Sequence, residues 1–296
     1  RKACIQTVAI TSRNTASAAE VAARHDIQRV HNNLIELLDD PEVHVLDIAV
    51  PPDVQPAVIK KAAEYKGKIT GILAQKPLAP SYAEACKLVD LCEKANIRLV
   101  VNQNMRYDQS VYACQNLLKK NILGEPILAT IEMRAIPHWM PWQKRLGWVT
   151  LRIMSIHHLD TFRFWFGNPV RVFTSSRSDP RTAQQFDHSD GICLTILEYE
   201  TSTDTGMSSS CGLRCLSLDD VWSGPDRKGA EEESFVNFRI EGMQGIAKGS
   251  LGWPAWPRHQ PSTLAWTDTT GNWHHPQWDE AWFPDAFVGP MAELLR

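Results

Sequence analysis

Residues 43–103 read VHVLDIAVPPDVQPAVIKKAAEYKGKITGILAQKPLAPSYAEACKLVDLCEKANIRLVVNQ. Three apolar runs in this segment, VHVLDIAV, KITGILA and IRLVVNQ, read as buried strands, and the stretches between them have the periodicity of amphipathic helices. Pro52 opens the first of these helices, which ends near Gly67, and Ser81 caps the second. Apolar strands that alternate with helices predict a parallel sheet covered on both faces, which is the doubly wound α/β architecture.

The alternation of strands and helices extends toward the N-terminus. IQTVAIT (residues 5–11) reads as a strand, NTASAAEVAAR (14–24) as an Ala-rich helix and residues 33–39 as a short helix. Residues 1–107 are therefore expected to form a Rossmann-type domain. The sequence contains no G-x-G-x-x-G, so the first strand and the glycine-rich loop of such a domain are expected to be missing at its N-terminus.

Residues 108–296 differ in pattern from the first domain. Helices are expected at 109–120 and 152–166, and most of the remaining segments alternate like strands, with EGMQG as a hairpin turn. This order predicts an α+β domain with an open, mainly antiparallel sheet. The apolar strands are expected to leave a sheet face for self-association, as a homodimer or homotetramer.

All 11 Trp lie in the second domain. Core packing is the plain interpretation for most of them. Trp139, Trp142 and Trp148 stand just before the second expected helix, where an indole could instead stack on the apolar face of a sugar ring.

Composition and charge exclude several classes of protein. With 43% hydrophobic and 22% charged residues over 296 positions, the chain has the composition of a folded globular protein. The net charge of -3 and the scattered Lys and Arg provide no basic surface, so no nucleic-acid partner is expected. No apolar run in the sequence approaches the ~18 residues that span a bilayer, so no membrane association is expected.

Cysteine usage indicates the compartment. The seven Cys are an odd number and several stand in apolar stretches, which indicates reduced thiols and a cytoplasmic location. No metal is expected, because neither the CGLRC pair nor the two His-His pairs have further ligands at metal-binding spacing.

A lysine stands at the carboxyl end of the run KITGILA, in Gln75-Lys76-Pro77. Ligands bind at this edge of parallel α/β sheets. A lysine there can donate a hydrogen bond or transfer a proton if partial burial lowers its pKa. The Lys-Pro dipeptide alone is common, and it more often marks only a turn.

Four motifs resemble, in the same order, the Gfo/Idh/MocA oxidoreductases, a family named after glucose-fructose oxidoreductase, inositol dehydrogenase and a rhizopine catabolism protein. Residues 50–55 (VPPDVQ) resemble the family's TPP...H loop, 75–79 (QKPLA) its EKPLA, 104–107 (NMRY) its N.R segment, and 153–167 its D...H..D helix ending in Gly. The resemblance implies a nicotinamide cofactor on the first domain, and a substrate site and subunit contacts on the open-faced sheet of the second. It also implies that the helix ending in MAELLR continues, so the second domain is expected to be incomplete at its C-terminus.

Two departures from the family pattern bear on the chemistry. Gln75 stands where the family has Glu, and Ile153 where it has an Asp four residues before a histidine. The resemblance implies that this histidine, His157, is the catalytic proton acceptor. It also implies that His157 acts together with Lys76, which comes from the other domain.

Asp160 follows His157 by one helical turn and could accept a hydrogen bond from one imidazole nitrogen, which would leave the other nitrogen free as a base. The alternative is purely structural. In that interpretation His157 and His158 cap a buried helix, and Asp160 pairs with Arg163.

The segment Thr11-Ser12-Arg13 ends the first expected strand. An acidic residue at this place of a Rossmann domain binds the ribose 2′-hydroxyl of NAD, whereas a small hydroxyl residue followed by Arg accepts the 2′-phosphate of NADP. Ser12 and Arg13 therefore predict a preference for NADP(H) over NAD(H). A solvated loop arginine is the alternative interpretation.

These features together predict an NADP(H)-dependent oxidoreductase that acts on a CH-OH group of a sugar, sugar derivative or cyclitol. His157 would take the hydroxyl proton in the oxidative direction, and Lys76 would donate a hydrogen bond to the reacting oxygen and hold the nicotinamide ribose with Gln75. Further cofactor contacts are expected from Ser12, Arg13, Pro51, Pro52, Gln55 and Asn104. Substrate contacts are expected from Arg106, Trp139, Arg152, His158 and Asp160.

Two other functions stay open at this point. Some relatives use a retained cofactor to oxidise a sugar transiently and then cleave a glycosidic bond, and a galactose-regulon repressor similar to this family uses the fold as a sensor. Loss of the family Glu and Asp favours a sensor. Retention of Lys76 and His157 favours an enzyme, because a sensor need not keep a proton-transfer pair.

Overall fold

The computed structural model describes residues 6–135, 140–200, 212–221, 234–252 and 260–296. The chain divides into an N-terminal unit, residues 1–102 with 289–296, and a C-terminal unit, residues 103–288. From the sequence, the boundary between the two domains was expected after residue 107, and all residues from 108 to the C-terminus were expected in the second domain. The last residues return to the first unit because Leu294 packs against Gly71, where the missing side chain leaves room for it.

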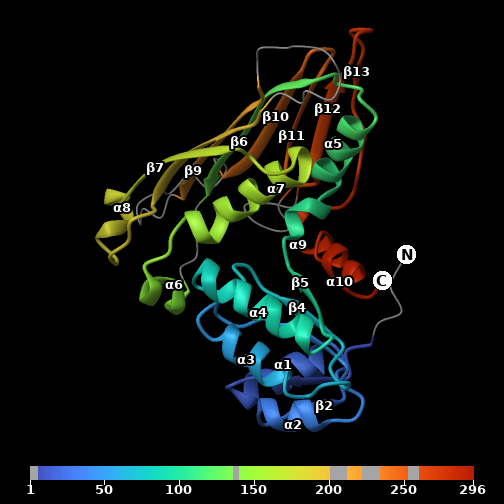
Figure 1. The fold of residues 1–296 in the computed structure, drawn as a ribbon, viewed down its shortest axis with the longest axis vertical. Helices are drawn as coiled ribbons and strands as arrows, with labels where there is room; N and C mark the ends of the chain where they lie inside the picture. Colours follow the sequence, from blue (N-terminus) through green and yellow to red (C-terminus); the bar gives the residue numbers. More distant parts are fainter. Residues whose placement is uncertain (1–5, 136–139, 201–211, 222–233, 253–259) are drawn as a thin grey trace. The chain divides into compact units, whose positions relative to one another are not determined.

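The described residues of the N-terminal unit form parallel strands in two groups (Figure 1). Strand β1 (Ala9–Thr11) pairs with β2 (Arg29–His31), and a second sheet has the order β3-β4-β5. The members of that sheet are β3 (Val45–Ile48), β4 (Gly71–Ala74) and β5 (Arg98–Val101). The helices are α1 (Thr15–Arg24), α2 (Leu34–Asp39), α3 (Gln55–Ala62), α4 (Tyr82–Lys94) and α10 (Val288–Leu294). The predicted α/β class is confirmed, whereas β2 was not predicted.

Side-chain caps explain where three of the helices begin. Asn14, Asn33 and Ser81 each accept a backbone N–H from the first turn of α1, α2 and α4 respectively. Such a cap satisfies a donor that has no partner within the helix and contributes about 1 kcal/mol. These starts are the ones that the sequence predicted.

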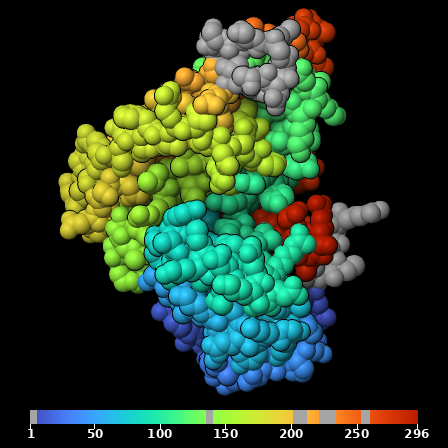
Figure 2. Space-filling view, viewed as in Figure 1, coloured from blue at the N-terminus to red at the C-terminus, as the bar shows by residue number. Residues whose placement is uncertain are grey.

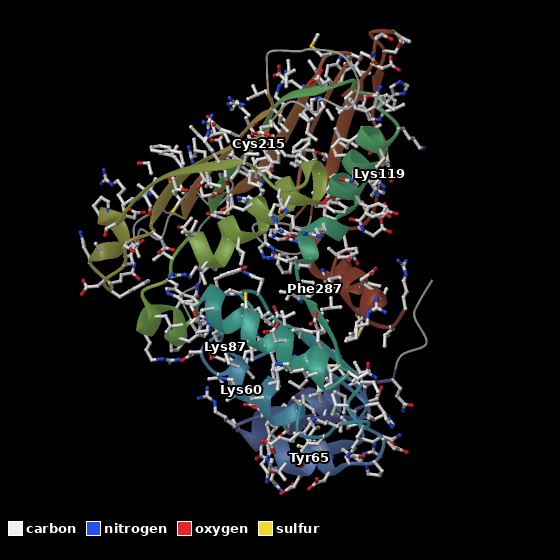
Figure 3. All side chains as sticks on the ribbon, in the orientation of Figure 1. Lys60, Tyr65, Lys87, Lys119, Cys215 and Phe287 are labelled. Atoms are coloured by element: carbon white, nitrogen blue, oxygen red, sulfur yellow. The ribbon has the colours of Figure 1, made fainter. Side chains whose placement is uncertain are left out.

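Strand β4 lies at the centre of the N-terminal core. All four of its residues are buried, and Ile72 and Ala74 belong to the same core cluster as Leu38 of α2, Ile59 of α3 and Leu88 of α4. The outer faces of α3 and α4 carry exposed charged side chains such as Lys60 and Lys87 (Figure 3). The core therefore fixes β4, and with it the turn that follows the strand.

An eight-stranded sheet forms the framework of the described part of the C-terminal unit, in the order β13-β12-β11-β10-β6-β9-β8-β7. Its strands are β6 (Pro126–Ala135), β7 (Arg171–Arg177), β8 (Ile192–Glu198), β9 (Arg214–Val221), β10 (Phe235–Gly242), β11 (Ile246–Ser250), β12 (Thr263–Thr267) and β13 (Trp273–His274). Only the β6-β9 pair is parallel among the described strand pairs of this sheet. The predicted open, mainly antiparallel sheet is confirmed.

Helices α5 (Gln109–Lys119) and α7 (Ile156–Phe166) lie along one face of this sheet (Figure 1). The other described helices of this unit are η1 (Asn104–Tyr107), α6 (Pro141–Leu146), η2 (Leu151–Ser155), α8 (Pro180–Ala183) and α9 (Trp282–Asp285). The covered face contributes alternate residues to the core, for example Ile131 of β6 and Phe238 of β10. Trp165 of α7 stacks edge-on against Phe238, with ring centroids 5.6 Å apart.

The opposite face of the sheet is open at β7 and β8. Phe173 is 65% exposed, and its register partner Ile196 and the neighbouring Leu194 are also exposed. These strands lie at the molecular surface, drawn in yellow tones in Figure 2. None of the helices in the described ranges is long and apolar enough to cross a membrane.

Candidate active site

The turn that carries Lys76 is held by the side chain of Gln55. This amide is fully buried at the start of α3. Its Nε2 donates to the carbonyl oxygens of Gln75 and Leu78, both at 2.9 Å, and its Oε1 accepts the backbone N–H of Gln75 at 2.7 Å. Because an amide both donates and accepts, one side chain fixes the turn from two sides.

The structure corrects the expected role of Gln55. A side chain with no exposed surface cannot contact a cofactor, and the amide is already bonded to the Lys76 turn. Gln55 therefore supports the site from within the protein. Gln75 itself is half-buried at the edge of the same turn.

Lys76 is half-buried at the carboxyl end of β4. Burial disfavours the charged ammonium and lowers the pKa of Lys76 to about 8. A lysine with this pKa is present in both protonation states near neutral pH, so it can donate a proton or a hydrogen bond.

Ser12 and Arg13 directly follow β1 and are exposed at the N-terminal end of α1. The Ser12 hydroxyl accepts the backbone N–H of Asn14 at 3.3 Å. A helix N-terminus beside a cation favours a bound anion. Of the two prolines after β3, Pro51 is half-buried and Pro52 is buried.

His157 lies on α7 and is 2% exposed. Its imidazole packs edge-on against the indole of Trp282, with ring centroids 5.3 Å apart and an interplanar angle of 89°. Trp282 is fully buried, and its Nε1–H donates to Oδ1 of Asn104 at 3.1 Å. The structure thus brings two of the predicted site residues, His157 and Asn104, to one indole.

The start of the His157 helix is held by Asp190. Its carboxylate accepts the backbone N–H groups of Val149, Thr150 and Leu151, at 3.0, 3.2 and 2.9 Å. These groups precede or begin the π-helical turn η2, which leads directly into α7. One buried carboxylate therefore satisfies the N–H groups at this helix start.

His158 was expected to contact the substrate, but its side chain is fully buried and bonded within the protein. Its Nδ1 lies 2.6 Å from Oδ1 of Asp219 on β9, and the Ser217 hydroxyl donates to the other carboxylate oxygen at 2.8 Å. Burial acts to raise the pKa of Asp219, but the charge and hydrogen bond of His158 outweigh it and the pKa is lowered. His158 therefore anchors α7 to the sheet.

Asp160 and Arg106 form a bidentate ion pair. The Arg106 Nε and Nη2 donate to the two carboxylate oxygens, both at 2.5 Å, and the guanidinium lies over the ring of Phe164. Both Asp160 oxygens accept from Arg106, and the structure shows no hydrogen bond between Asp160 and His157, which the sequence had led us to expect. The alternative pairing is not formed either, because Arg163 donates to Asn168.

The remaining predicted substrate residues lie on the segment before α7. The exposed Arg152 places its guanidinium 4.7 Å from the ring centroid of Trp148, which is largely buried. Trp142 is half-buried on α6. Trp139 lies outside the described residues.

The predicted site residues form separate groups within each unit. One group, in the N-terminal unit, consists of Gln55, Gln75 and Lys76. The C-terminal unit holds two more: Arg106 is paired with Asp160, and Asn104 and His157 both contact Trp282. Lys76 and His157 belong to different units. Their convergence on one carbinol stays a prediction.

Two groups of residues in the N-terminal unit have side chains of the kind that could bind the two riboses of a nicotinamide dinucleotide. A hydroxyl and a cation, Ser12 and Arg13, stand exposed after β1, and half-buried donors, Gln75 and Lys76, stand after β4. The glycine-rich turn that binds a pyrophosphate is not among residues 1–296. No residue of this chain is therefore assigned to the pyrophosphate.

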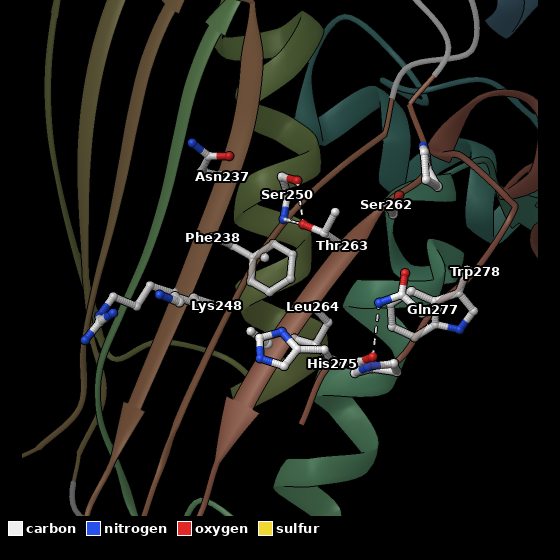
Figure 4. Close-up of a pocket in the computed structure, with 15 residues that line it drawn as sticks. Asn237, Phe238, Lys248, Ser250, Ser262, Thr263, Leu264, His275, Gln277 and Trp278 are labelled. Carbon is white, nitrogen blue, oxygen red and sulfur yellow. Dashed lines mark hydrogen bonds between the residues drawn. The ribbon is translucent and has the colours of Figure 1, made fainter. Parts of the chain in front are cut away.

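No group of three or more His, Cys, Asp or Glu suited to a metal ion occurs within the part of the chain that the structure describes. A groove of about 590 Å³ lies over β10, β11, β12 and the segment at 275–278 (Figure 4). Its lining includes Asn237, Lys248, Thr263 and His275 but none of the predicted site residues. The groove and the predicted site residues therefore lie in different places of the chain.

Three supporting residues were not found from the sequence. The sequence could have indicated Asp219. Every second residue of β9, Cys215, Ser217 and Asp219, is buried, so the strand pattern predicts that the Asp219 carboxylate faces the core. Asp190 stands in a polar loop and Trp282 among 11 Trp, so neither had a distinguishing pattern.

The N-terminal residues match a known family. Residues 1–103 match the model of the Gfo/Idh/MocA oxidoreductases, described as the oxidoreductase family with an NAD-binding Rossmann fold. The match covers residues 1–103, so this part of the chain is similar to the Gfo/Idh/MocA family. The resemblance noted in the sequence is thereby confirmed.

Dehydrogenases are among the curated proteins that are similar to this chain. The chain is 25% identical over 208 residues to the D-apiose dehydrogenase of Rhizobium rhizogenes, which covers 67% of this chain and 59% of that protein. It is 30% identical over 189 residues to an uncharacterized oxidoreductase of Synechocystis, which covers 59% of this chain and 50% of that protein. The chain therefore spans only part of the length of the curated relatives it matches.

Solved structures share the fold over most of this chain. Levoglucosan dehydrogenase in complex with NADH and levoglucosan has a TM-score of 0.76 at 17% identity, over 97% of this chain and 80% of that one. An oxidoreductase from Agrobacterium radiobacter in complex with NAD+, L-tartaric acid and magnesium has a TM-score of 0.71 at 21% identity, over 95% and 76%. At these identities the likeness shows the two-unit fold alone.

Proposed function

We propose that the protein is a nicotinamide-dependent dehydrogenase that acts on a CH-OH group of a sugar, sugar derivative or cyclitol. The observation that carries this proposal is Lys76, whose turn is clamped by the buried Gln55 at a ligand-binding edge and whose pKa burial lowers to about 8. The sugar dehydrogenases among the similar proteins support the substrate class.

In this proposal the chain's own residues orient the reactants and move the proton. Lys76 donates a hydrogen bond to the reacting oxygen, and His157 takes the hydroxyl proton in the oxidative direction. Gln75 and Lys76 hold the nicotinamide ribose. A bound nicotinamide supplies the hydride-transfer chemistry.

Kinetics of two variants test the proposal. His157→Asn keeps dinucleotide binding and lowers turnover by roughly 10²- to 10⁴-fold, the usual contribution of a positioned acid or base. Lys76→Ala lowers turnover and also weakens dinucleotide affinity. The exposed His275→Asn is the control and leaves both unchanged. Turnover of His157→Asn at the wild-type rate would remove the proposed mechanism.

We propose further that the cofactor is NADP(H) rather than NAD(H), with Ser12 and Arg13 holding the 2′-phosphate. Loss of one charge-assisted contact costs about 1.5 to 3 kcal/mol, so Arg13→Ala weakens NADP binding about tenfold or more and leaves NAD binding unchanged. Arg24→Ala, an exposed arginine of α1, is the matched control. Tighter binding of NAD than of NADP by the unaltered protein contradicts the assignment.

We propose also that the protein is a cytoplasmic homodimer or homotetramer. The open sheet face at Phe173, Leu194 and Ile196 supports self-association, because an exposed apolar patch favours a partner. The five cysteines among the described residues are all free thiols, which supports a reducing compartment.

A further inference from the structure

The imidazole of His157 has an aromatic neighbour. Among the described residues, Asp160 of α7 is bonded to Arg106, and Asp219, which lies against the helix, to His158. The ring of Trp282, in contrast, meets the imidazole at 5.3 Å and nearly at a right angle. The orientation of the imidazole is therefore set in part by packing against an indole.

Trp282 is itself rigidly held. Its side chain is fully buried, and its backbone N–H donates to the carbonyl oxygen of Gly252 at 3.2 Å. Phe283 packs against the indole with ring centroids 4.6 Å apart. The indole N–H donates to Asn104 Oδ1, which is 3% exposed on η1. A ring fixed at so many points can fix a neighbouring ring in turn.

We infer that Trp282 is a positioning residue, which holds the imidazole of His157 in its working orientation by an edge-to-face contact and links it through the indole N–H to Asn104. This inference rests on the proposed function only in that His157 is taken as the proton acceptor. The contact itself joins α9, near the C-terminal end of the unit, to α7 and η1.

Kinetics of graded variants test the role in catalysis. Trp282→Leu removes the ring and lowers kcat by about 10- to 100-fold, because a displaced base loses alignment, while KM for the carbinol substrate changes less than about threefold. Trp282→Phe keeps an aromatic ring and recovers most of kcat. Trp266→Phe is the matched control, since Trp266 stacks on His274, which is not a site residue, at 3.9 Å. A proportional rise of KM with no fall in kcat would overturn the inference.

Nuclear magnetic resonance tests the positioning independently of activity. The imidazole proton resonances of His157, assigned by comparison with His157→Asn, shift in Trp282→Leu and shift less in Trp282→Phe. Asn104→Ala removes the acceptor and shifts the indole N–H resonance of Trp282 without loss of fold. Trp266→Phe moves neither set.

The two kinds of measurement separate the two hypotheses. Unchanged His157 resonances in Trp282→Leu overturn the positioning role, even if the protein is a dehydrogenase. The expected shifts in a protein without dehydrogenase turnover would refute the proposed function and leave the contact in place. If Trp282→Leu fails to fold, Trp282→Phe and Asn104→Ala decide the question through the same resonances.

Discussion

The ammonium of Lys76 determines an expected pH dependence, because its pKa in the folded protein is lowered to about 8 by burial. If protonated Lys76 donates to the reacting oxygen, kcat/KM falls as the pH rises through about 8. Lys76→Arg stays protonated over this range and moves the falling limb upward by more than about two pH units. If kcat/KM of Lys76→Arg falls at the same pH as in the wild type, a group other than Lys76 causes the fall.

The same group affects stability with a definite sign. Lys76 has a folded pKa below the ordinary value of 10.5, so the unfolded chain binds more protons between about pH 8 and 10.5. The contribution of Lys76 to stability therefore rises with pH across this window. Lys76→Met lacks this rise, which urea unfolding at several pH values would measure.

Arg106 and Asp160 are expected to act as one unit. Their bidentate pair is partly buried, with the Asp160 side chain 11% exposed. In a double-mutant cycle, Arg106→Gln and Asp160→Asn should show a coupling energy of about 0.5 to 3 kcal/mol in unfolding experiments. Additive effects would mean that the pair contributes no net interaction.

At the residue scale, sequence motifs singled out Lys76 and His157, whose catalytic roles stay proposals, but they did not reveal which side chains the predicted residues contact. The motif predicted a cofactor contact for Gln55, whereas its side chain is buried. The position of a residue in a motif does not reveal whether its side chain faces the solvent or the core. Asp160 was expected to bond His157, one turn away, yet it bonds Arg106, 54 residues away in sequence. Contacts between distant segments follow from tertiary packing, which local spacing does not encode.

At the scale of elements, the helix expected at 152–166 forms as the turn η2 followed by α7. The π-helical start depends on Asp190, which is about 40 residues away in sequence and therefore invisible to local periodicity. The missed strand β2 has only three residues, too few to show a pattern. The longer helices were predictable because their caps and apolar spacing agree.

The bond between α7 and β9 should be important for the stability of the C-terminal unit. Asp219→Asn breaks the fully buried pair with His158 and should cost about 3 to 5 kcal/mol, because it leaves a buried group without its partner. Tryptophan fluorescence during urea unfolding measures this unit alone, since all 11 Trp lie between residues 139 and 282. The exposed Asp279→Asn is the control, with an effect below about 0.5 kcal/mol.

The effect of Asp219→Asn should also depend on pH. The folded pKa of Asp219 is lowered, so its stabilising contribution is complete above about pH 4, the ordinary range of an aspartate. It is lost as the pH falls through the lowered folded pKa. A difference between wild type and variant that grows on acidification would contradict this account.

At the scale of the whole molecule, the open sheet face predicts self-association. Phe173→Glu places a charge in the middle of the exposed apolar patch and should shift sedimentation toward the monomer, with dissociation at least about tenfold easier. Tyr82→Glu alters a side chain that is 87% exposed on the N-terminal unit and should leave the oligomer unchanged. A ~33 kDa species in both the wild type and Phe173→Glu at micromolar concentration would contradict the proposal.

The class of each unit was predictable from the sequence, but the path of the chain between the units was not. Strand and helix periods specify a parallel α/β unit and a mainly antiparallel one. The return of residues 289–296 to the first unit depends on Leu294 meeting Gly71, and on Glu293 pairing with Arg98 at 3.6 Å. The sequence of such a short apolar segment does not indicate which part of the protein it packs against.

The division of the parallel strands into β1-β2 and β3-β4-β5 has a consequence for hydrogen exchange. An amide on a strand edge without a neighbour opens at little cost, whereas β4, between two strands, opens only with the unit. In deuterated solvent, alternate amides of β1 and β3 should therefore lose their protons long before those of β4. Slow exchange along the whole of β3 would mean that another strand lies against this edge in solution.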